Sequence, residues 1–182
     1  MRVVKLALLA VLAYTITLGA QAPAKPGNPV SDAIRSGWNG AKRNMLGSVK
    51  VMPQGKYGFR PAETVRTYGQ ILAHVAGANY EFCAAARGEK PPFTEDHFEK
   101  TATTPAAIGK ALQDSVTYCD AAYTALTDAS AAEIINGPFG GGKEARAAGL
   151  MSNTNHNNEH YGNLVTYLRI NGLVPPSSAP SQ

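Results

Sequence analysis

Charged residues are scarce in this sequence, and clustered basic residues are missing from it. Only 16% of the 182 residues are charged, and no stretch alternates runs of Lys or Arg with aromatic side chains. The formal net charge is +4, but we expect Arg2 and Lys5 to be removed, which leaves 15 basic and 13 acidic residues, or +2. Nucleic-acid-binding domains carry a basic patch or stripe. The sequence therefore argues against a nucleic acid as partner.

Cysteine is also rare, and no segment alternates apolar and polar residues as a half-buried strand does. Two cysteines exclude a small scaffold held by many disulfides. A hydrophobic content of 44% argues against disorder, and the length fits one ordinary domain. We therefore predict a single all-α domain with a core of its own.

The amino-terminal segment has the pattern of a secretory signal peptide. A short basic start leads into the apolar run Leu6 to Leu18, and the small residues Gly19 and Ala20 follow. The run is too short for a comfortable membrane span. We predict that residues 1–20 are a signal peptide cleaved after Ala20, and that 21–30 form a Pro-rich linker. The mature protein would be periplasmic or secreted, with no membrane attachment.

Four segments repeat apolar residues with the period of a helix. They run from Ser31 to about Met52, from about Glu63 to Arg87, from Pro105 to about Leu126, and from about Met151 to Asn171. The domain would thus span residues 31–178, with a tail at 179–182. The stretch 128–149 has no clear pattern, and GPFGGGKE within it is predicted to be a loop.

The connection between the second and third predicted helices is long, about fifteen residues. Such a length suits a crossover that returns to the starting end, so that these two helices run parallel. Cys83 and Cys119 would then differ in height by roughly 9 Å, at 1.5 Å per helical residue. Either a disulfide or two buried thiols is compatible with that placement.

The sequence has four histidines, which are its candidate metal ligands, and two of them lie four residues apart on one predicted helix. His156 and His160 share a face with Leu164 and Leu168, which points the pair toward the core. His74 lies in line with Ile71, Ala78 and Phe82. Inward histidines from two helices of a bundle can converge on one metal ion. His97 lies in the polar connection, where we expect it to be solvated.

Two further patterns have weaker support: one resembles a phosphate-binding loop and the other a metallopeptidase motif. GPFGGGKE has Glu144 where a phosphate-binding loop needs Ser or Thr. HNNEH matches the H-x-x-E-H metallopeptidase pattern with Glu159 as general base, but no Asp or Glu follows Glu159 to supply a third ligand. A catalytic role for Glu159 stays an alternative.

The stretch MPQGKYGFRPAETVRTYGQILAHVAGANYEFC and the carboxy-terminal NHNNEHYGNLVTYLRINGLVPPSS together resemble the DinB-like superfamily. The resemblance covers roughly residues 31–178. It implies a four-helix bundle with up-down-down-up connectivity and a divalent-metal site made by His74, His156 and His160. It also implies an activity, because characterised members are thiol-dependent transferases or isomerases and others are assigned as metal-dependent hydrolases.

We therefore expect an exported protein that binds one divalent ion, from among zinc, nickel, iron and manganese, since imidazole suits several of these metals. Three neutral histidines leave a coordination position open, which favours a metal-dependent hydrolase or transferase acting on a small-molecule substrate. The alternative is a non-catalytic exported protein that holds a metal or small ligand, or a bundle whose histidines are structural. Exposed helix faces would permit a homodimer.

Overall fold

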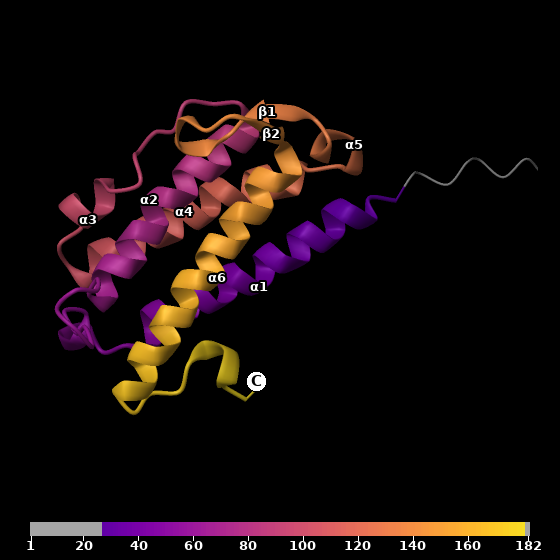
Figure 1. Ribbon diagram of the computed structural model, residues 1–182. Helices are drawn as coiled ribbons and strands as arrows, with labels where there is room; N and C mark the ends of the chain where they lie inside the picture. The colour runs from indigo at the N-terminus through magenta and orange to yellow at the C-terminus, as the bar shows by residue number, and fades with distance from the viewer. Residues whose placement is uncertain (1–26, 181–182) are drawn as a thin grey trace, which may run out of the picture.

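The computed structural model describes residues 27–180, and four long helices make up most of it (Figure 1). They are α1 (Pro29–Val51), α2 (Tyr68–Arg87), α4 (Pro105–Ala125) and α6 (Arg146–Ile170). The shorter elements are η1 (Gln54–Lys56), α3 (His97–Thr101), α5 (Asp128–Ala131), β1 (Ile134–Asn136), η2 (Pro138–Gly140), β2 (Lys143–Ala145) and η3 (Pro176–Ser178). The predicted signal peptide and most of the predicted linker lie outside the described residues. Within residues 27–180, no helix is both long and apolar enough to cross a membrane.

Capping explains where α2 begins and ends. Thr67 and Gln70 form a reciprocal capping box, in which each side chain accepts a hydrogen bond from the other's backbone N–H. At the other end Gly88 adopts a left-handed conformation with φ 71°, which Gly takes without steric cost. The predicted start near Glu63 was therefore five residues early, because the cap at Thr67 comes after an irregular turn.

The region that the sequence left unassigned holds a small hairpin. Strands β1 and β2 pair antiparallel, with Ile134 opposite Ala145. Strands of three residues are too short to show an alternating pattern, so nothing in the sequence indicated this hairpin, and the domain is otherwise helical as predicted. GPFGGGKE contains the turn of the hairpin and the first two residues of β2, and α6 follows directly from Arg146, five residues before the predicted start.

The four long helices run up, down, down and up, as predicted. Helices α2 and α4 are parallel, since Gly69 faces Ile108 near both starts and Cys83 is joined to Cys119 by a disulfide further along. Cys83 is residue sixteen of α2 and Cys119 residue fifteen of α4, so their heights match. The predicted mismatch of about 9 Å came from starting α2 too early. Of the two alternatives left open, the structure has the disulfide.

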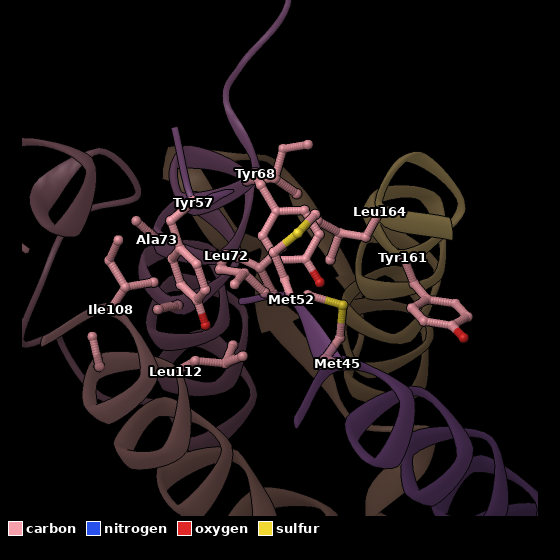
Figure 2. Packing of buried hydrophobic residues seen from close by; sticks show 14 of the residues in the cluster. Met45, Met52, Tyr57, Tyr68, Leu72, Ala73, Ile108, Leu112, Tyr161 and Leu164 are labelled. Carbon is pink, nitrogen blue, oxygen red and sulfur yellow. The ribbon is translucent and has the colours of Figure 1, made fainter. Parts of the chain in front are cut away.

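Helix α2 is the central helix of the bundle, because it packs on both α4 and α6 and most of its residues are buried. Figure 2 shows Tyr68, Leu72 and Ala73 from α2 packed among Met45, Met52, Tyr57, Ile108, Leu112 and Leu164. A second cluster nearer the hairpin contains Trp38, whose indole stacks on the ring of Tyr123 at a centroid distance of 4.7 Å. The site described next lies between α2 and α6, on the side of α2 that faces α3.

Candidate metal centre

Three histidines converge between α2 and α6. His156 Nε2 lies 3.1 Å from His74 Nε2 and 3.1 Å from His160 Nε2. One nitrogen from each ring falls within 4.8 Å of the other two. His74 and His160 are buried and His156 is half-buried. The structure thus brings together the three side chains that the sequence predicted as metal ligands.

The register between α2 and α6 places these rings. The two helices run antiparallel, and a row of buried polar contacts joins them. Asn157, one turn before His160, donates from Nδ2 to Asn79 Oδ1 at 2.8 Å, and Asn153 Nδ2 lies 3.6 Å from Cys83 Sγ one turn further along. Buried amides without partners are costly, so these bonds disfavour a slide of one helix past the other. His156 and His160 then face His74 because residues four apart share a helix face.

Burial keeps the three imidazoles neutral. Desolvation, with a smaller contribution from the charge of Arg66, lowers the pKa of His74 to about 4. The pKa of His156 is lowered to about 3, first by desolvation and then by the neighbouring histidines. Desolvation also lowers the pKa of His160, although the charge of Glu159 partly opposes it. At neutral pH all three rings therefore offer lone pairs, which metal binding requires.

The donor set fits a metal ion better than it fits a hydrogen-bonded cluster. A neutral imidazole nitrogen has either one N–H or one lone pair, so His156 Nε2 cannot bond well to both neighbours at once. The Nδ1 atoms of all three rings are buried and lack an aligned hydrogen bond to any described residue. Nitrogens bound to one tetrahedral ion at about 2.0–2.1 Å lie about 3.3–3.4 Å apart. The observed 3.1 Å separations are close to this value.

Two carboxylates that the sequence did not single out lie beside His74. Glu99 Oε1 is 3.2 Å from His74 Nδ1, and Glu95 Oε1 is 3.4 Å from His74 Nε2. Both come from the long connection between α2 and α4. Their spacing of four residues was the only sequence signal, and such pairs are common on solvated helices. The four-residue spacing points to His74 only once the path of the connection across α2 is known.

A hollow in the surface lies beside Glu95, although none of the three histidines is part of its lining. It has a volume of about 530 Å³, and its lining includes Glu81, Glu95 and Phe139. Phe139 packs edge-on against Phe82, and the Phe82 ring lies 5.6 Å from that of His156. The turn of the β1–β2 hairpin therefore forms one wall of the hollow and packs on Phe82, the aromatic neighbour of His156.

The other two predicted features fall outside the cluster. Glu159 is exposed and makes no hydrogen bond or ion pair within residues 27–180, so its predicted role as base gains no support from the geometry. His97 was expected to be solvated. It is half-buried instead, with its ring 4.6 Å from that of Phe93 and 4.8 Å from that of Phe98. The imidazole packs against these two half-buried rings, and this contact removes part of its surface from solvent.

The fold and the cluster define a class of protein: an up-down-down-up helical bundle with three histidines gathered between its second and fourth long helices. A sequence model described as the DinB superfamily matches residues 38–164. The chain belongs to the DinB superfamily.

Several solved structures share the fold. A DinB-like protein from Bacillus cereus ATCC 10987 is 20% identical, with a TM-score of 0.67 over 80% of this chain and 95% of that one. A DinB-family protein from Exiguobacterium sibiricum 255-15 is 16% identical, with a TM-score of 0.59 over 79% and 92%. The mycothiol-dependent maleylpyruvate isomerase is 14% identical, with a TM-score of 0.60 over 74% of this chain and 60% of the isomerase. Among curated proteins, none matches this sequence.

Proposed function

We propose that this protein binds one divalent metal ion through His74, His156 and His160 and acts as a metal-dependent hydrolase or transferase. The convergence of three neutral imidazoles is the observation that carries the proposal: His156 Nε2 lies 3.1 Å from both His74 Nε2 and His160 Nε2. Buried imidazoles of this kind are the ligands that zinc, nickel and iron accept. Membership of the DinB superfamily, and the fold shared with the mycothiol-dependent maleylpyruvate isomerase, support an enzymatic role.

The chemistry would come from an ion with an incomplete protein shell. A divalent ion held by three neutral histidines acidifies bound water and polarises a substrate oxygen. The chain's own residues supply the rest. Helices α2 and α6 fix the three rings, Phe82 covers one side of His156, and the hollow beside Glu95 and Phe139 gives a small substrate access. This arrangement suits attack on an ester, an amide or a similar electrophile.

The activity can be tested with a panel of small ester and amide substrates. We expect zinc- or nickel-loaded protein to hydrolyse at least one of them, chelator-treated protein to be inactive, and re-addition of the metal to restore the rate. His156→Ala should abolish the activity, whereas Asp114→Asn, an exposed carboxylate that pairs with Lys110, should leave it unchanged. Turnover that survives chelation and the loss of His156 would disprove a metal-dependent reaction at this site.

A second candidate is an exported protein that holds the metal or a small ligand without turnover. The exposed position of Glu159 favours it, because the one carboxylate predicted as a base on α6 makes no hydrogen bond or ion pair with the histidines among the described residues. Under this alternative the metal-loaded protein would retain a tightly held ion and show no rate above that of His156→Ala with any substrate.

We also propose that the protein is exported. The signal-like residues 1–20 predict it, and the buried Cys83–Cys119 disulfide supports it, since such bonds persist in oxidising compartments. Expression of the full chain followed by amino-terminal sequencing should yield mature protein beginning at Gln21 outside the cytoplasm. Recovery of intact chain in the cytoplasm with reduced thiols would contradict this.

A further inference from the structure

The connection between α2 and α4 does more than return the chain to the other end of the bundle. It crosses α2 beside the metal-binding histidines and is held there by close packing. A Cβ atom at Gly77 would lie 2.0 Å from the carbonyl oxygen of Glu95, so only a glycine lets the connection approach α2 this closely. Phe98 packs against the core, and Ala102 is buried in it. The connection is therefore a fixed part of the site's surroundings.

The two carboxylates of this connection reach opposite nitrogens of one ring. Glu99 lies at Nδ1 of His74, on the side away from the other histidines, and Glu95 lies at Nε2, on the side facing them. Neither His156 nor His160 has a carboxylate oxygen within 4 Å among the described residues. His74, the only ligand from α2, thus differs from the α6 pair in having acidic neighbours.

Glu99 has the surroundings of an outer-shell partner. Its side chain is only 18% exposed, and its other oxygen accepts a hydrogen bond from Arg66 Nε at 3.1 Å. Arg66 is held in turn, because its carbonyl accepts a hydrogen bond from the Tyr167 hydroxyl on α6. When His74 binds a metal through Nε2, its proton is on Nδ1, which becomes a donor. A small rotation of the Glu99 carboxylate would turn the 3.2 Å contact into an aligned hydrogen bond.

Glu95 lies near enough to His74 to reach an ion bound there after a side-chain rotation, although its oxygens as placed are not part of the cluster formed by the three histidines. Its Oε1 lies 3.4 Å from His74 Nε2, about the separation of two ligand atoms that share one ion. The side chain is 42% exposed and lines the hollow, so it can rotate toward an ion without breaking buried contacts. The negative charge of Glu95 also acts on Glu81, whose pKa is raised first by desolvation and then by repulsion from Glu95.

We propose that the α2–α4 connection completes the metal centre with two carboxylates. Glu99 is a positioning residue that accepts the Nδ1 proton of His74 and fixes its ring. Glu95 is a fourth protein ligand, an oxygen donor added to the three histidine nitrogens, and an ion that takes five or six ligands keeps a position open for water or substrate beside these four. This inference rests on the proposed metal site and extends its donor set. It predicts that the site accepts oxygen-preferring ions such as manganese and iron more readily than three histidines alone would.

Cobalt(II) serves as the probe, because its visible spectrum reports the donor set and its affinity can be measured by competition with a chelator. Variants that lose an outer-shell partner typically bind metal 10–100-fold more weakly. We expect Glu99→Ala to bind cobalt 10–100-fold more weakly with an unchanged spectrum, and Glu99→Gln, which keeps an acceptor, to recover most of the affinity. Glu95→Gln should change the spectrum at unchanged stoichiometry.

Two controls separate these effects from a general loss of structure. Arg66→Gln breaks the ion pair with Glu99 but leaves Glu99 beside His74, so its cobalt affinity should stay within about threefold of wild type. Asp114→Asn should match wild type in affinity and spectrum. Helical circular dichroism confirms that each variant folds.

The outcomes distinguish this inference from the proposed function. If wild type binds no cobalt, the metal site itself is wrong and this inference fails with it. If wild type binds one cobalt while Glu99→Ala retains its affinity, Glu99 is not a positioning residue. If Glu95→Gln retains the wild-type spectrum, Glu95 is not a ligand. A loss of affinity in Arg66→Gln as large as in Glu99→Ala would assign the effect to the ion pair instead.

Discussion

Removal of the Cys83–Cys119 disulfide should destabilise the bundle by a calculable amount. The two cysteines are 36 residues apart, and the bond ties α2 to α4 across the long connection. Closing a loop of this length in the unfolded chain costs entropy equivalent to about 4 kcal/mol at 25 °C. For a domain of this size that corresponds to a fall in Tm of about 8–16 °C.

Cys83→Ala/Cys119→Ala is the direct perturbation. Asn153 Nδ2 lies near both sulfurs but also donates to the Tyr123 hydroxyl at 3.2 Å, so the variant leaves no buried amide without a partner. Urea unfolding followed by circular dichroism should give a free energy of unfolding about 4 kcal/mol below that of oxidised wild type. Reductant should lower the wild type to the same value and leave the variant unchanged. A loss below about 1 kcal/mol, or a reductant effect on the variant, would refute the loop-entropy reasoning.

Three further predictions concern the site and its supports. The pKa values of His74 and His156, about 4 and 3, lie below the unfolded value of 6.5, so the unfolded metal-free chain binds more protons as the pH falls. The contribution of these histidines to the free energy of unfolding should therefore be constant above about pH 6.5 and fall below it, by up to about 1.4 kcal/mol per pH unit for each histidine; a flat profile in urea titrations between pH 7 and 4 would contradict this. Gly77→Ala should destabilise the protein and weaken metal binding, although a helical Gly→Ala change ordinarily gains about 1 kcal/mol, because the new methyl group collides with the connection; a higher Tm would show that the contact yields. Asn157→Ala should cost about 1–3 kcal/mol in urea unfolding by leaving Asn79 Oδ1 without its donor, and wild-type stability would argue against the buried amide pair.

Helical periodicity was enough to predict the four long helices and their order. The apolar stripes identified each helix, and the length of the connection after Arg87 indicated the parallel α2–α4 pair that the disulfide confirms. Helix ends were less accurate. The starts of α2 and α6 depend on a capping box at Thr67 and on a hairpin of three-residue strands, and neither feature changes the hydrophobic period.

The candidate site could be predicted only where it lies on regular helices. The spacing of His156 and His160 fixed their shared face, and His74 followed from the stripe of its own helix. Glu95 and Glu99 lie in a connection whose path depends on the absence of a side chain at Gly77, and periodicity says nothing about such contacts. The half-buried position of His97 likewise depends on Phe93 and Phe98, which fold back together only in three dimensions.

The metal content of the mature, untagged protein, purified without chelator, tests the central claim most directly. Elemental analysis of wild type should be compared with that of the His156→Ala/His160→Ala variant after both have been incubated with zinc or nickel and desalted. We expect about one metal ion per chain in wild type and none in the variant. No metal in either protein, or equal amounts in both, would contradict a metal site built by His74, His156 and His160.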